Sequence, residues 1–310
     1  MAKKAVVTGG AGFIGSHIAK ALLARGGDVH SVDYGVHVVD NYAAGKFDNR
    51  FHKGVTYHEV NICDYGKLAP IIAGADYIFH EAALPRVQFS IEHPIETFEV
   101  NVMGLVNVLK AAHEGKAKRV VFASSGSVYG DQETMPLVET MPPMPKSPYG
   151  LQKSMGEQMC RLWSQVYGLQ TVVLRYFNVY GSHMDPNGAY ALAIAKFIKQ
   201  RKEGKHITIW GDGTHSRDFT HVRDVVQANL LAAESPNVGT GEVINIGAGR
   251  NRTVNDIAVA IGGPVVHEPE RLEPAHALAD NRKAKELLGW QPTIALEDGI
   301  AELKKEAGMQ

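Results

Sequence analysis

The apolar positions in the first half of the chain fall into two alternating kinds of block. Short runs rich in β-branched and aromatic residues predict buried strands, at 4–8, 77–80, 119–123 and 171–176. Longer blocks carry an apolar residue every three or four positions and predict helices, at 13–25, about 100–114 and 151–167. Strands that alternate with helices imply right-handed crossovers and a parallel sheet. We therefore expect residues 1–176 to form a doubly wound α/β domain.

The pattern becomes less regular after about residue 177. It predicts a turn, a helix and two short strands, at 185–188, 189–203, 207–210 and 243–246. We expect residues 177–310 to form mainly a smaller α/β lobe that binds the substrate. A segment near 217–247 is expected to return to the first domain.

Two similar segments compete for the second strand of the sheet. Residues 29–33 read VHSVD, and residues 35–40 read GVHVVD, which resembles an imperfect tandem duplication. Each segment ends in an aspartate, so the choice of strand also decides between Asp33 and Asp40.

A glycine-rich turn joins the first strand to the first helix. Gly9 permits a tight turn, Gly12 lets the backbone approach a pyrophosphate, and Gly15 lets the helix pack closely on the strand. The free N–H groups at the start of the helix, together with its dipole, favour phosphate binding. This context predicts a Rossmann-type dinucleotide-binding fold.

Such a fold needs an acidic residue at the end of the second strand, about 20 residues further on, to hold the adenosine ribose. Asp33 lies 18 residues after Gly15 and Asp40 lies 25 after it, so the spacing favours Asp33. We prefer Asp40, because an insertion is tolerated better before the strand than at the cofactor edge. A carboxylate there favours NAD over NADP, since it repels a 2′-phosphate.

A phenol, an ammonium group and a set of hydroxyls are candidates for chemistry. Tyr149 and Lys153 are four residues apart and lie on one face of a helix that begins by Tyr149. A nearby lysine is expected to lower the pKa of the phenol, which fits it for acid–base work on a sugar hydroxyl. Ser125 follows the strand at 119–123, at the sheet edge where such folds bind ligands.

Composition narrows the classes of partner. The chain has 310 residues, and its 32 basic and 33 acidic residues give a net charge of −1, without the basic excess of a general nucleic-acid binder. Its two cysteines give neither a disulfide framework nor zinc spacing, and the histidines show no metal-binding cluster, so no metal site is expected. No apolar stretch is long enough to span a membrane. A cytoplasmic location without membrane or nucleic-acid partners is expected.

Taken together, these residues resemble those of an extended short-chain dehydrogenase/reductase, in the NAD-dependent nucleotide-sugar epimerase/dehydratase family. The likeness covers nearly the whole chain. The motifs follow the family order: TGGAGFIG at 8–15, DNYAAG at 40–45, HEAA at 80–83, SSGSVYG at 124–130, YGLQK at 149–153, RYFNVYG at 175–181 and RDFTHVRD at 217–224.

The resemblance implies roles for the matching positions. Ser125, Tyr149 and Lys153 resemble the catalytic hydroxyl, the base and the lysine that holds the nicotinamide ribose. Asn61 stands where many relatives have an Asp that contacts adenine. The implied NAD-binding positions are Gly9, Gly12, Phe13, Ile14, Gly15, Asp40, Asn41, Gly45, Asn61, Ile62, Ala82, Ala83, Asn101, Tyr149, Lys153 and Phe177. The implied substrate-binding positions are Ser125, Tyr149, Asn178, Trp210, Arg217, Arg271 and Ala277.

The residue after Ser125 narrows the activity within the resemblance. Dehydratases and decarboxylases of the family usually carry acids after the catalytic hydroxyl, whereas this chain has Gly126. The resemblance thus implies a UDP-sugar 4-epimerase that oxidises C4 transiently to a ketone. The small Ala277 implies room for an N-acetyl group, so that UDP-GlcNAc/GalNAc are accepted beside UDP-glucose/galactose.

Several alternatives remain open at this point. They are a UDP-glucuronate 4-epimerase, an epimerase of a GDP- or dTDP-linked sugar, a 4,6-dehydratase, and a non-catalytic NAD-binding regulator. The family habit also implies a homodimer formed through helices near 101–114 and 150–166. The apolar stripe of the second helix (Leu151, Met155, Met159, Leu162 and Val166) fits either a dimer contact or the core of the protein itself.

Overall fold

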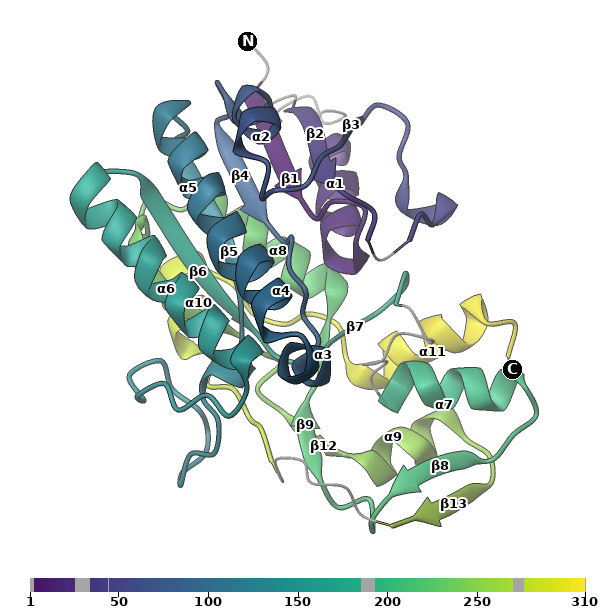
Figure 1. Ribbon diagram of the computed structural model, residues 1–310. Coiled ribbons are helices and arrows are strands. Elements are labelled where there is room, and N and C mark those ends of the chain that lie inside the picture. Colours follow the sequence, from purple (N-terminus) through teal and green to yellow (C-terminus); the bar gives the residue numbers. More distant parts are fainter. Residues whose placement is uncertain (1–2, 26–33, 44, 185–192, 270–275, 310) are drawn as a thin grey trace.

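The computed structural model describes residues 3–25, 34–43, 45–184, 193–269 and 276–309 (Figure 1). A parallel sheet of seven strands lies at its centre, in the order β11-β6-β5-β4-β1-β2-β3. The strands are β1 Lys3–Thr8, β2 Tyr34–Asp40, β3 Thr56–Glu59, β4 Tyr77–His80, β5 Arg119–Ser125, β6 Gln170–Tyr176 and β11 Thr240–Ile246. The strand order reverses beside β1, which is where open α/β sheets bind ligands.

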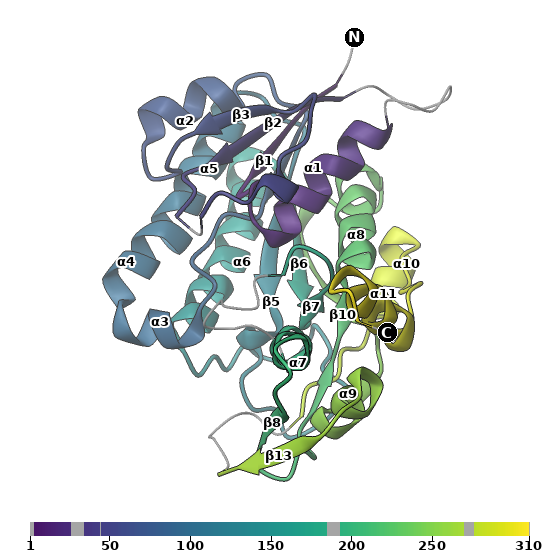
Figure 2. The same ribbon diagram turned by 90° about the vertical axis from the view of Figure 1, so that its right-hand side faces the viewer.

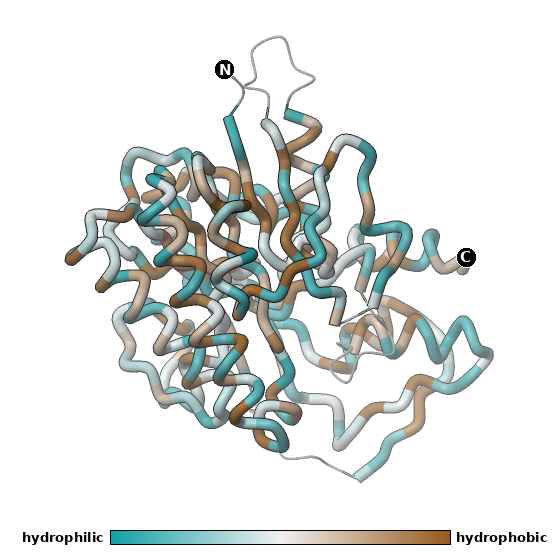
Figure 3. Tube along the Cα trace, turned by 45° about the horizontal axis from the view of Figure 1, so that its top comes forward, coloured by the Kyte–Doolittle hydropathy of each residue, from teal (hydrophilic) through white to brown (hydrophobic). Residues whose placement is uncertain are grey.

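Helices cover both faces of this sheet, which explains why its strands are apolar on both sides. One face packs against α1 (Phe13–Arg25), α8 (Val222–Glu234) and α10 (Arg282–Leu288). The other packs against α2 (Tyr65–Ile72), α5 (Gly104–Glu114) and α6 (Pro148–Tyr167). Hydrophobic residues accordingly run through the central strands, as Figure 3 shows. The expected Rossmann-type fold is confirmed.

A second apolar cluster lies below this sheet in Figure 1, between α7 (Ala193–Lys202), α9 (Val254–Ile261) and α11 (Leu296–Glu306). Three two-stranded pairs accompany these helices. They are β7 (Val179–Tyr180) with β10 (Thr220–His221), β9 (Ser216–Asp218) with β12 (Asn251–Thr253), and β8 (Ile207–Trp210) with β13 (Val265–Glu268). Figure 2 shows β8, β13 and α9 at the end of the molecule farthest from β1 and β2.

The structure bears on three of the expected elements. The block expected at 100–114 is a π-helical turn, Glu99–Met103, followed by α5. Helix α7 spans Ala193–Lys202 within the expected 189–203, and the first part of that range, with the turn expected at 185–188, lies outside the described residues. The second strand ends at Asp40, whereas Asp33 also lies outside the described residues. The domain boundary near residue 176 stays a prediction. Strand β11 pairs with β6 in the seven-stranded sheet, and α8 packs against the same sheet.

Candidate active site

Two hydroxyl groups meet at the carboxyl end of β5. Ser125 ends this strand, and its side chain makes a hydrogen bond with Tyr149. Ser127 donates to the Ser125 Oγ twice, from its backbone N at 3.2 Å and from its own Oγ at 3.0 Å. The Ser125 oxygen is therefore held in place from one side while it faces the phenol.

The start of α6 places Tyr149 and Lys153 together. Ser147 caps the helix by accepting a hydrogen bond from the Gly150 N, and Pro148 occupies the first turn, where its missing N–H costs nothing. Tyr149 thus lies inside the helix, one turn before Lys153. The Lys153 Nζ lies 5.8 Å from the centre of the Tyr149 ring and donates to the Ala123 carbonyl oxygen at 2.6 Å.

Burial controls the protonation of this pair. It raises the pKa of Tyr149 to about 12, against the hydrogen bond from Ser125, and lowers the pKa of Lys153 to about 8. The lowered phenol pKa expected from the lysine is therefore wrong for the protein alone, because burial raises the pKa of Tyr149 most and the negative charge of Glu81 raises it further. A cation bound beside Tyr149 would be needed to bring the phenol toward neutrality.

Sequence reasoning missed a carboxyl group beside this pair. Glu81 follows β4 directly, and its Oε1 accepts a hydrogen bond from the Tyr176 hydroxyl at 2.8 Å. Burial raises the pKa of Glu81 to about 7, although Tyr176 and the charge of Lys153 act in the opposite direction. The available signal was its position, because a charged residue directly after a buried strand lies at the ligand-binding edge.

The glycine turn, residues 9–15, forms the phosphate cradle. Gly9 has a φ of +68°, and a Cβ on it would lie 2.6 Å from the Ala82 backbone N. A Cβ on Gly15 would lie 2.3 Å from the Gly9 carbonyl oxygen, and one on Gly12 would lie 2.9 Å from the same atom. The cradle therefore requires glycines for its backbone geometry and carries no side chain at positions 9, 12 and 15, which fits a bound pyrophosphate.

Asp40 closes the cradle at the end of β2. Its carboxylate accepts from the Ala11 N at 3.0 Å and from the Tyr42 N at 2.7 Å. Partial burial raises the pKa of Asp40 against these two hydrogen bonds. The acid therefore lies beside the cradle, in the position that a dinucleotide ribose requires.

The other predicted cofactor positions surround the same sheet edge. Phe13 and Ile14 begin α1, and Asn41 accepts a hydrogen bond from the Ala43 N. Gly45 has a φ of +98°. Asn61 accepts from the Cys63 N in a turn, Ile62 is buried against Gly104, and Ala82 and Ala83 follow Glu81.

Asn101 lies in the π-helical turn and ties three segments together. Its Oδ1 accepts from the Leu84 N at 2.8 Å, and its Nδ2 donates to the Leu84 oxygen at 3.2 Å and to the Gln152 Oε1 at 2.7 Å. Gln152 is the neighbour of Lys153. The extra residue of the π turn thus aims Asn101 at the loop after β4, as such turns often do at functional sites.

Phe177 lies directly under the turn that carries Ser125. A Cβ on Gly126 would lie 3.2 Å from the Phe177 ring, which is buried. A larger residue at position 126 would therefore have to displace this ring. The structure thus makes position 126 tight for any side chain.

The predicted substrate residues come from short strands of the second cluster. Asn178 has a φ of +30°, and its Nδ2 donates to the Asp218 carbonyl oxygen at 3.0 Å. Arg217 precedes Asp218 on β9 and donates to the Ser216 oxygen. The buried Asp218 carboxylate accepts three backbone N–H groups, those of Ala248, Gly249 and Ala279, and so fixes the strand that carries Arg217.

The remaining predicted residues are placed less closely together. Trp210 ends β8 and is 38% exposed, so its ring is not part of the core. Ala277 donates from its backbone N to the Ser216 oxygen at 3.2 Å, beside Arg217. Arg271 lies outside the described residues.

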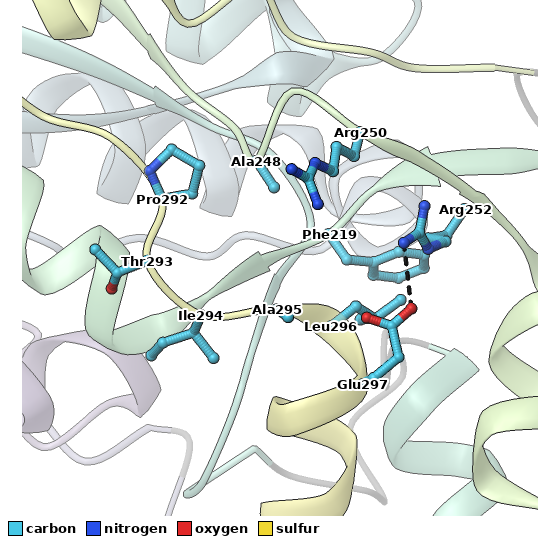
Figure 4. Close-up of a pocket in the computed structure, with 10 residues that line it drawn as sticks. All are labelled: Phe219, Ala248, Arg250, Arg252, Pro292, Thr293, Ile294, Ala295, Leu296 and Glu297. Atoms are coloured by element: carbon cyan, nitrogen blue, oxygen red, sulfur yellow. Dashed lines mark hydrogen bonds and ion pairs between the residues drawn. The ribbon is translucent and has the colours of Figure 1, made fainter.

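A cavity of about 240 Å³ lies next to β12 and the start of α11 (Figure 4). Its lining includes Phe219, Arg250, Arg252 and the first residues of α11. Arg252 pairs with Glu297 at 3.2 Å, and it lies opposite Arg217 in the β9–β12 ladder, on the same face. Arg250 and Arg252 were not among the predicted residues. Arg250 lies four residues after the end of β11 and Arg252 lies within β12, and the available signal was two arginines close together in the turn region that follows β11.

The fold and this geometry define a class: a dinucleotide-binding α/β enzyme with a serine, a tyrosine and a lysine at the switch point of its sheet. The model of the NAD dependent epimerase/dehydratase family matches residues 5–247, and the chain belongs to this family. NAD is therefore its cofactor, which fits the cradle and Asp40 described above.

Three similar proteins place the chain within the family. The structure of UDP-glucose 4-epimerase from Thermotoga maritima, solved with UDP-glucose, has a TM-score of 0.89 and 37% identity over 98% of this chain and 99% of that one. UDP-N-acetylglucosamine 4-epimerase from Methanobrevibacter ruminantium, solved with UDP-N-acetylmuramic acid, also has a TM-score of 0.89, with 34% identity and the same coverage. UDP-N-acetyl-alpha-D-glucosaminuronate decarboxylase from Bacillus cytotoxicus is 33% identical over 97% of both chains.

None of the helices described is both long and apolar enough to cross a membrane. No group of three or more His, Cys, Asp or Glu side chains in the described ranges could hold a metal ion.

Proposed function

We propose that this protein is a UDP-hexose 4-epimerase, which inverts C4 of UDP-glucose and UDP-galactose. The observation that supports this most is the arrangement of Ser125, Tyr149 and Lys153 beside Gly126. The three groups can move a proton at one hydroxyl, whereas Gly126 supplies no carboxyl for an elimination or a decarboxylation.

In the proposed reaction Tyr149 acts as base and then as acid. Its phenolate accepts the proton of the C4 hydroxyl, and Ser125 holds the same oxygen by a hydrogen bond. NAD, held by the cradle, Asp40 and Lys153, would supply the redox chemistry at C4, as hydride acceptor and then hydride donor to the opposite face of the sugar. Tyr149 then gives its proton back to the C4 oxygen of the 4-keto sugar. The Lys153 ammonium stabilises the phenolate throughout.

The cofactor contacts follow from the cradle. The backbone N–H groups at the start of α1 bind the pyrophosphate, and Asp40 with Asn41 binds the adenosine ribose. Lys153 binds the nicotinamide ribose, and Phe177 bounds the pocket under Gly126. The remaining members of the proposed NAD site are Phe13, Ile14, Gly45, Asn61, Ile62, Ala82, Ala83 and Asn101.

The substrate diphosphate is assigned to Arg217 and Asn178, with Arg271 as a further predicted contact. Trp210, exposed at the end of β8, offers an aromatic face for the uracil. Ala277 lies next to Arg217 in space and presents only a methyl group. This supports acceptance of UDP-GlcNAc and UDP-GalNAc, because a larger side chain would take the room of an N-acetyl group.

A homodimer is proposed through the helices on the α4–α6 side. The stripe of α6 is largely outward-facing, since Leu151, Leu162 and Val166 are 50%, 48% and 62% exposed. Helix α4 (Pro94–Phe98) packs beside α6, and its Ile95 is 84% exposed. An uncovered apolar stripe on neighbouring helices is typical of a protein interface.

The test is a parallel incubation of the purified protein with UDP-glucose, UDP-galactose, UDP-GlcNAc and UDP-GlcUA, resolved by chromatography. We expect C4 epimers to form from the first three without added NAD. Exclusive conversion of UDP-GlcUA would assign the chain to uronate chemistry instead. No conversion of any substrate, even with added NAD, would contradict the proposal. The matched variant Ala277→Tyr should lose the N-acetylated substrates and keep the plain hexoses.

A further inference from the structure

A carboxyl group that no step above uses lies beside the catalytic pair. Glu81 follows β4, and its Oε1 accepts the Tyr176 hydroxyl at 2.8 Å. Tyr176 in turn receives a hydrogen bond from the Asn229 Nδ2 at 2.7 Å, and that amide also donates to the Val225 oxygen. The three side chains come from β4, β6 and α8, so the sheet and a helix hold the carboxyl in one position.

The groups around Glu81 are polar on one side and cationic on the other. Tyr176 faces it from β6, and neutral Asn229 lies behind that phenol on α8. In the β4–β5 pair His80 lies beside Phe122, so Glu81 follows beside Ala123, whose carbonyl oxygen accepts a hydrogen bond from the Lys153 ammonium. From this position the charge of Glu81 interacts with Lys153 and Tyr149 on α6. On its own strand, His80 is engaged with the Thr8 hydroxyl at 2.7 Å. Lys153 is thus the cation that faces this carboxyl.

The second carboxylate near Lys153 is already compensated. Glu157 binds Arg175 through two hydrogen bonds, of 2.8 and 2.7 Å, and accepts the Ser124 hydroxyl. By contrast, no salt bridge involves Glu81 in the part of the chain that the structure describes. The buried Lys153 donates to a neutral carbonyl, that of Ala123. Among the described residues, the charge of Glu157 is therefore compensated by Arg175, whereas no salt bridge compensates the charge of Glu81.

We propose that Glu81 is a positioning residue that keeps the buried Lys153 side chain in its ammonium form and so sets the protonation of Tyr149. This rests on the proposed function, because it assigns Glu81 to the same proton transfer. Burial alone pushes Lys153 toward the neutral amine, and among the raising influences on its pKa the charge of Glu81 is the largest. An amine in place of the ammonium would no longer stabilise the phenolate.

The direction of the effect follows from charge. A carboxylate raises the pKa of Lys153, and it also raises the pKa of the Tyr149 phenol. Glu81→Gln removes the charge and keeps the shape. Both limbs of the pH profile should therefore move to lower pH together, by about 1 unit. Tyr176→Phe removes the hydrogen bond that favours the ionised form of Glu81, so it should produce a smaller shift in the same direction.

Two readouts test the proposal on the full-length, NAD-containing protein. The first is the pH dependence of kcat and kcat/KM for the wild type, E81Q and Y176F. The second needs no turnover: the ultraviolet titration of the Tyr149 phenolate, obtained by subtracting the titration of Y149F in each background. The matched control is Glu139→Gln, which removes a half-buried carboxylate that accepts from the Asn245 N and is not among the groups that shift the pKa of Glu81, Tyr149 or Lys153.

The outcomes separate this proposal from the proposed function. Lower-pH shifts in E81Q and Y176F, with none in E139Q, would support the role of Glu81. The proposal would be overturned if E81Q lost activity equally at every pH, with both limbs of the pH profile in their wild-type positions. It would also be overturned if the phenolate titration did not shift. Glu81 would then have only a structural role. If the wild type epimerises no UDP-sugar, the proposed function fails, while the phenolate titration still decides on Glu81. If E81Q does not fold, Y176F decides alone.

Discussion

The phosphate cradle and the arginine-bearing side of the second lobe are built from different parts of the chain. The cradle is built from backbone atoms, and Gly9 and Gly15 are required because a Cβ on either would approach backbone atoms within 3 Å. The other region is built from side chains, since Arg217 and Arg252 project from two short strands far apart in sequence. The comparison teaches that the cradle tolerates almost no substitution but is easy to locate from sequence, whereas we expect substitutions in the proposed substrate region to change specificity and keep the fold.

The largest expected effect concerns the helix between these two regions. Tyr149→Phe should lower kcat by about 10²- to 10⁴-fold, because it removes the acid–base group. Retained NAD and the KM for UDP-sugar should change little, since neither the cradle nor the lobe is touched. Turnover assays and the NAD content of the purified protein measure this. An active Phe variant would contradict the assignment.

Tyr129→Phe is the matched control for that variant. The Tyr129 hydroxyl is buried and donates to the Asn245 Oδ1 at 2.7 Å, away from the catalytic pair. Its loss should cost about 1–3 kcal/mol in the free energy of unfolding, because the amide oxygen loses its partner. The kcat should stay near that of the wild type.

The second effect tests the backbone character of the cradle. Gly9→Ala and Gly74→Ala impose the same conformational strain, because their φ angles are +68° and +70°. Gly74 has open space around it, so this variant should lose only about 1 kcal/mol of stability. Gly9→Ala should lose more and should release NAD during purification. Chemical unfolding and NAD content measure both, and equal behaviour of the two variants would mean that close approach to Ala82 is unimportant.

The third effect tests the side-chain character of the lobe. Arg217→Leu should raise the KM for UDP-sugar about 10- to 100-fold with little change in kcat, because a charge-assisted contact to the diphosphate is lost. Arg252→Leu should raise KM by a smaller factor, since Arg252 is shared with Glu297. Glu297→Gln frees Arg252 and should lower KM. A kcat effect in R217L without a KM effect would move this arginine out of the substrate site.

The smallest expected effect concerns the seam between α1 and the segment after β7. The His17 ring stacks on that of His183 at 4.4 Å, and the Ser16 hydroxyl contacts the His183 Nδ1 at 3.2 Å. Burial, together with the charge of His17, lowers the pKa of His183 to about 4. The folded state therefore binds fewer protons than the unfolded state, so stability is present above the ordinary histidine pKa of 6.5 and is lost as pH falls from there toward 4.

His183→Asn should reduce this acid sensitivity. Asparagine tolerates the φ of +68° at this position and does not titrate. Because the ring is about half exposed, we expect a difference on the order of 1 kcal/mol after solvent screening. Urea unfolding at pH 7.5 and 5.0 measures it. The same pH dependence in the variant and the wild type would exclude His183 as its source.

The elements in the first half of the chain could be predicted because the hydrophobic periodicity of the sequence agrees there with the burial of the residues in the structure. Strands such as β5 are buried on both faces, and α1 has the expected bounds. The break before α5 could not be predicted, since the π turn at Asn101 depends on contacts with Leu84 and Gln152 from other elements. The end of β2 at Asp40 needed the structure as well, because the duplicated segments have the same pattern.

The candidate site shows the same division. Ser125, Tyr149 and Lys153 could be identified because short spacings along one strand and one helix place them. The electrostatic surroundings of these residues could not be predicted from sequence spacing. The sheet brings Glu81 to Lys153, and burial raises the pKa of Tyr149. Arg252 is paired with Arg217 only by the register of two short strands.

The late position of β11 bears on how the protein is made. A ribosome releases β5 and β6 long before Thr240–Ile246 exists, so β6 leaves the exit tunnel with an open edge. The Arg119 guanidinium of β5 can already donate to Gln170 of β6, but its other acceptors are carbonyls of Ala232, Ala233, Ser235 and Val238, which come later. A nascent chain paused after residue 176 would thus expose an unpaired strand edge, which is prone to pairing with a neighbouring chain, and a cation with only part of its acceptors. The half that holds the cofactor is completed only by the last third of translation.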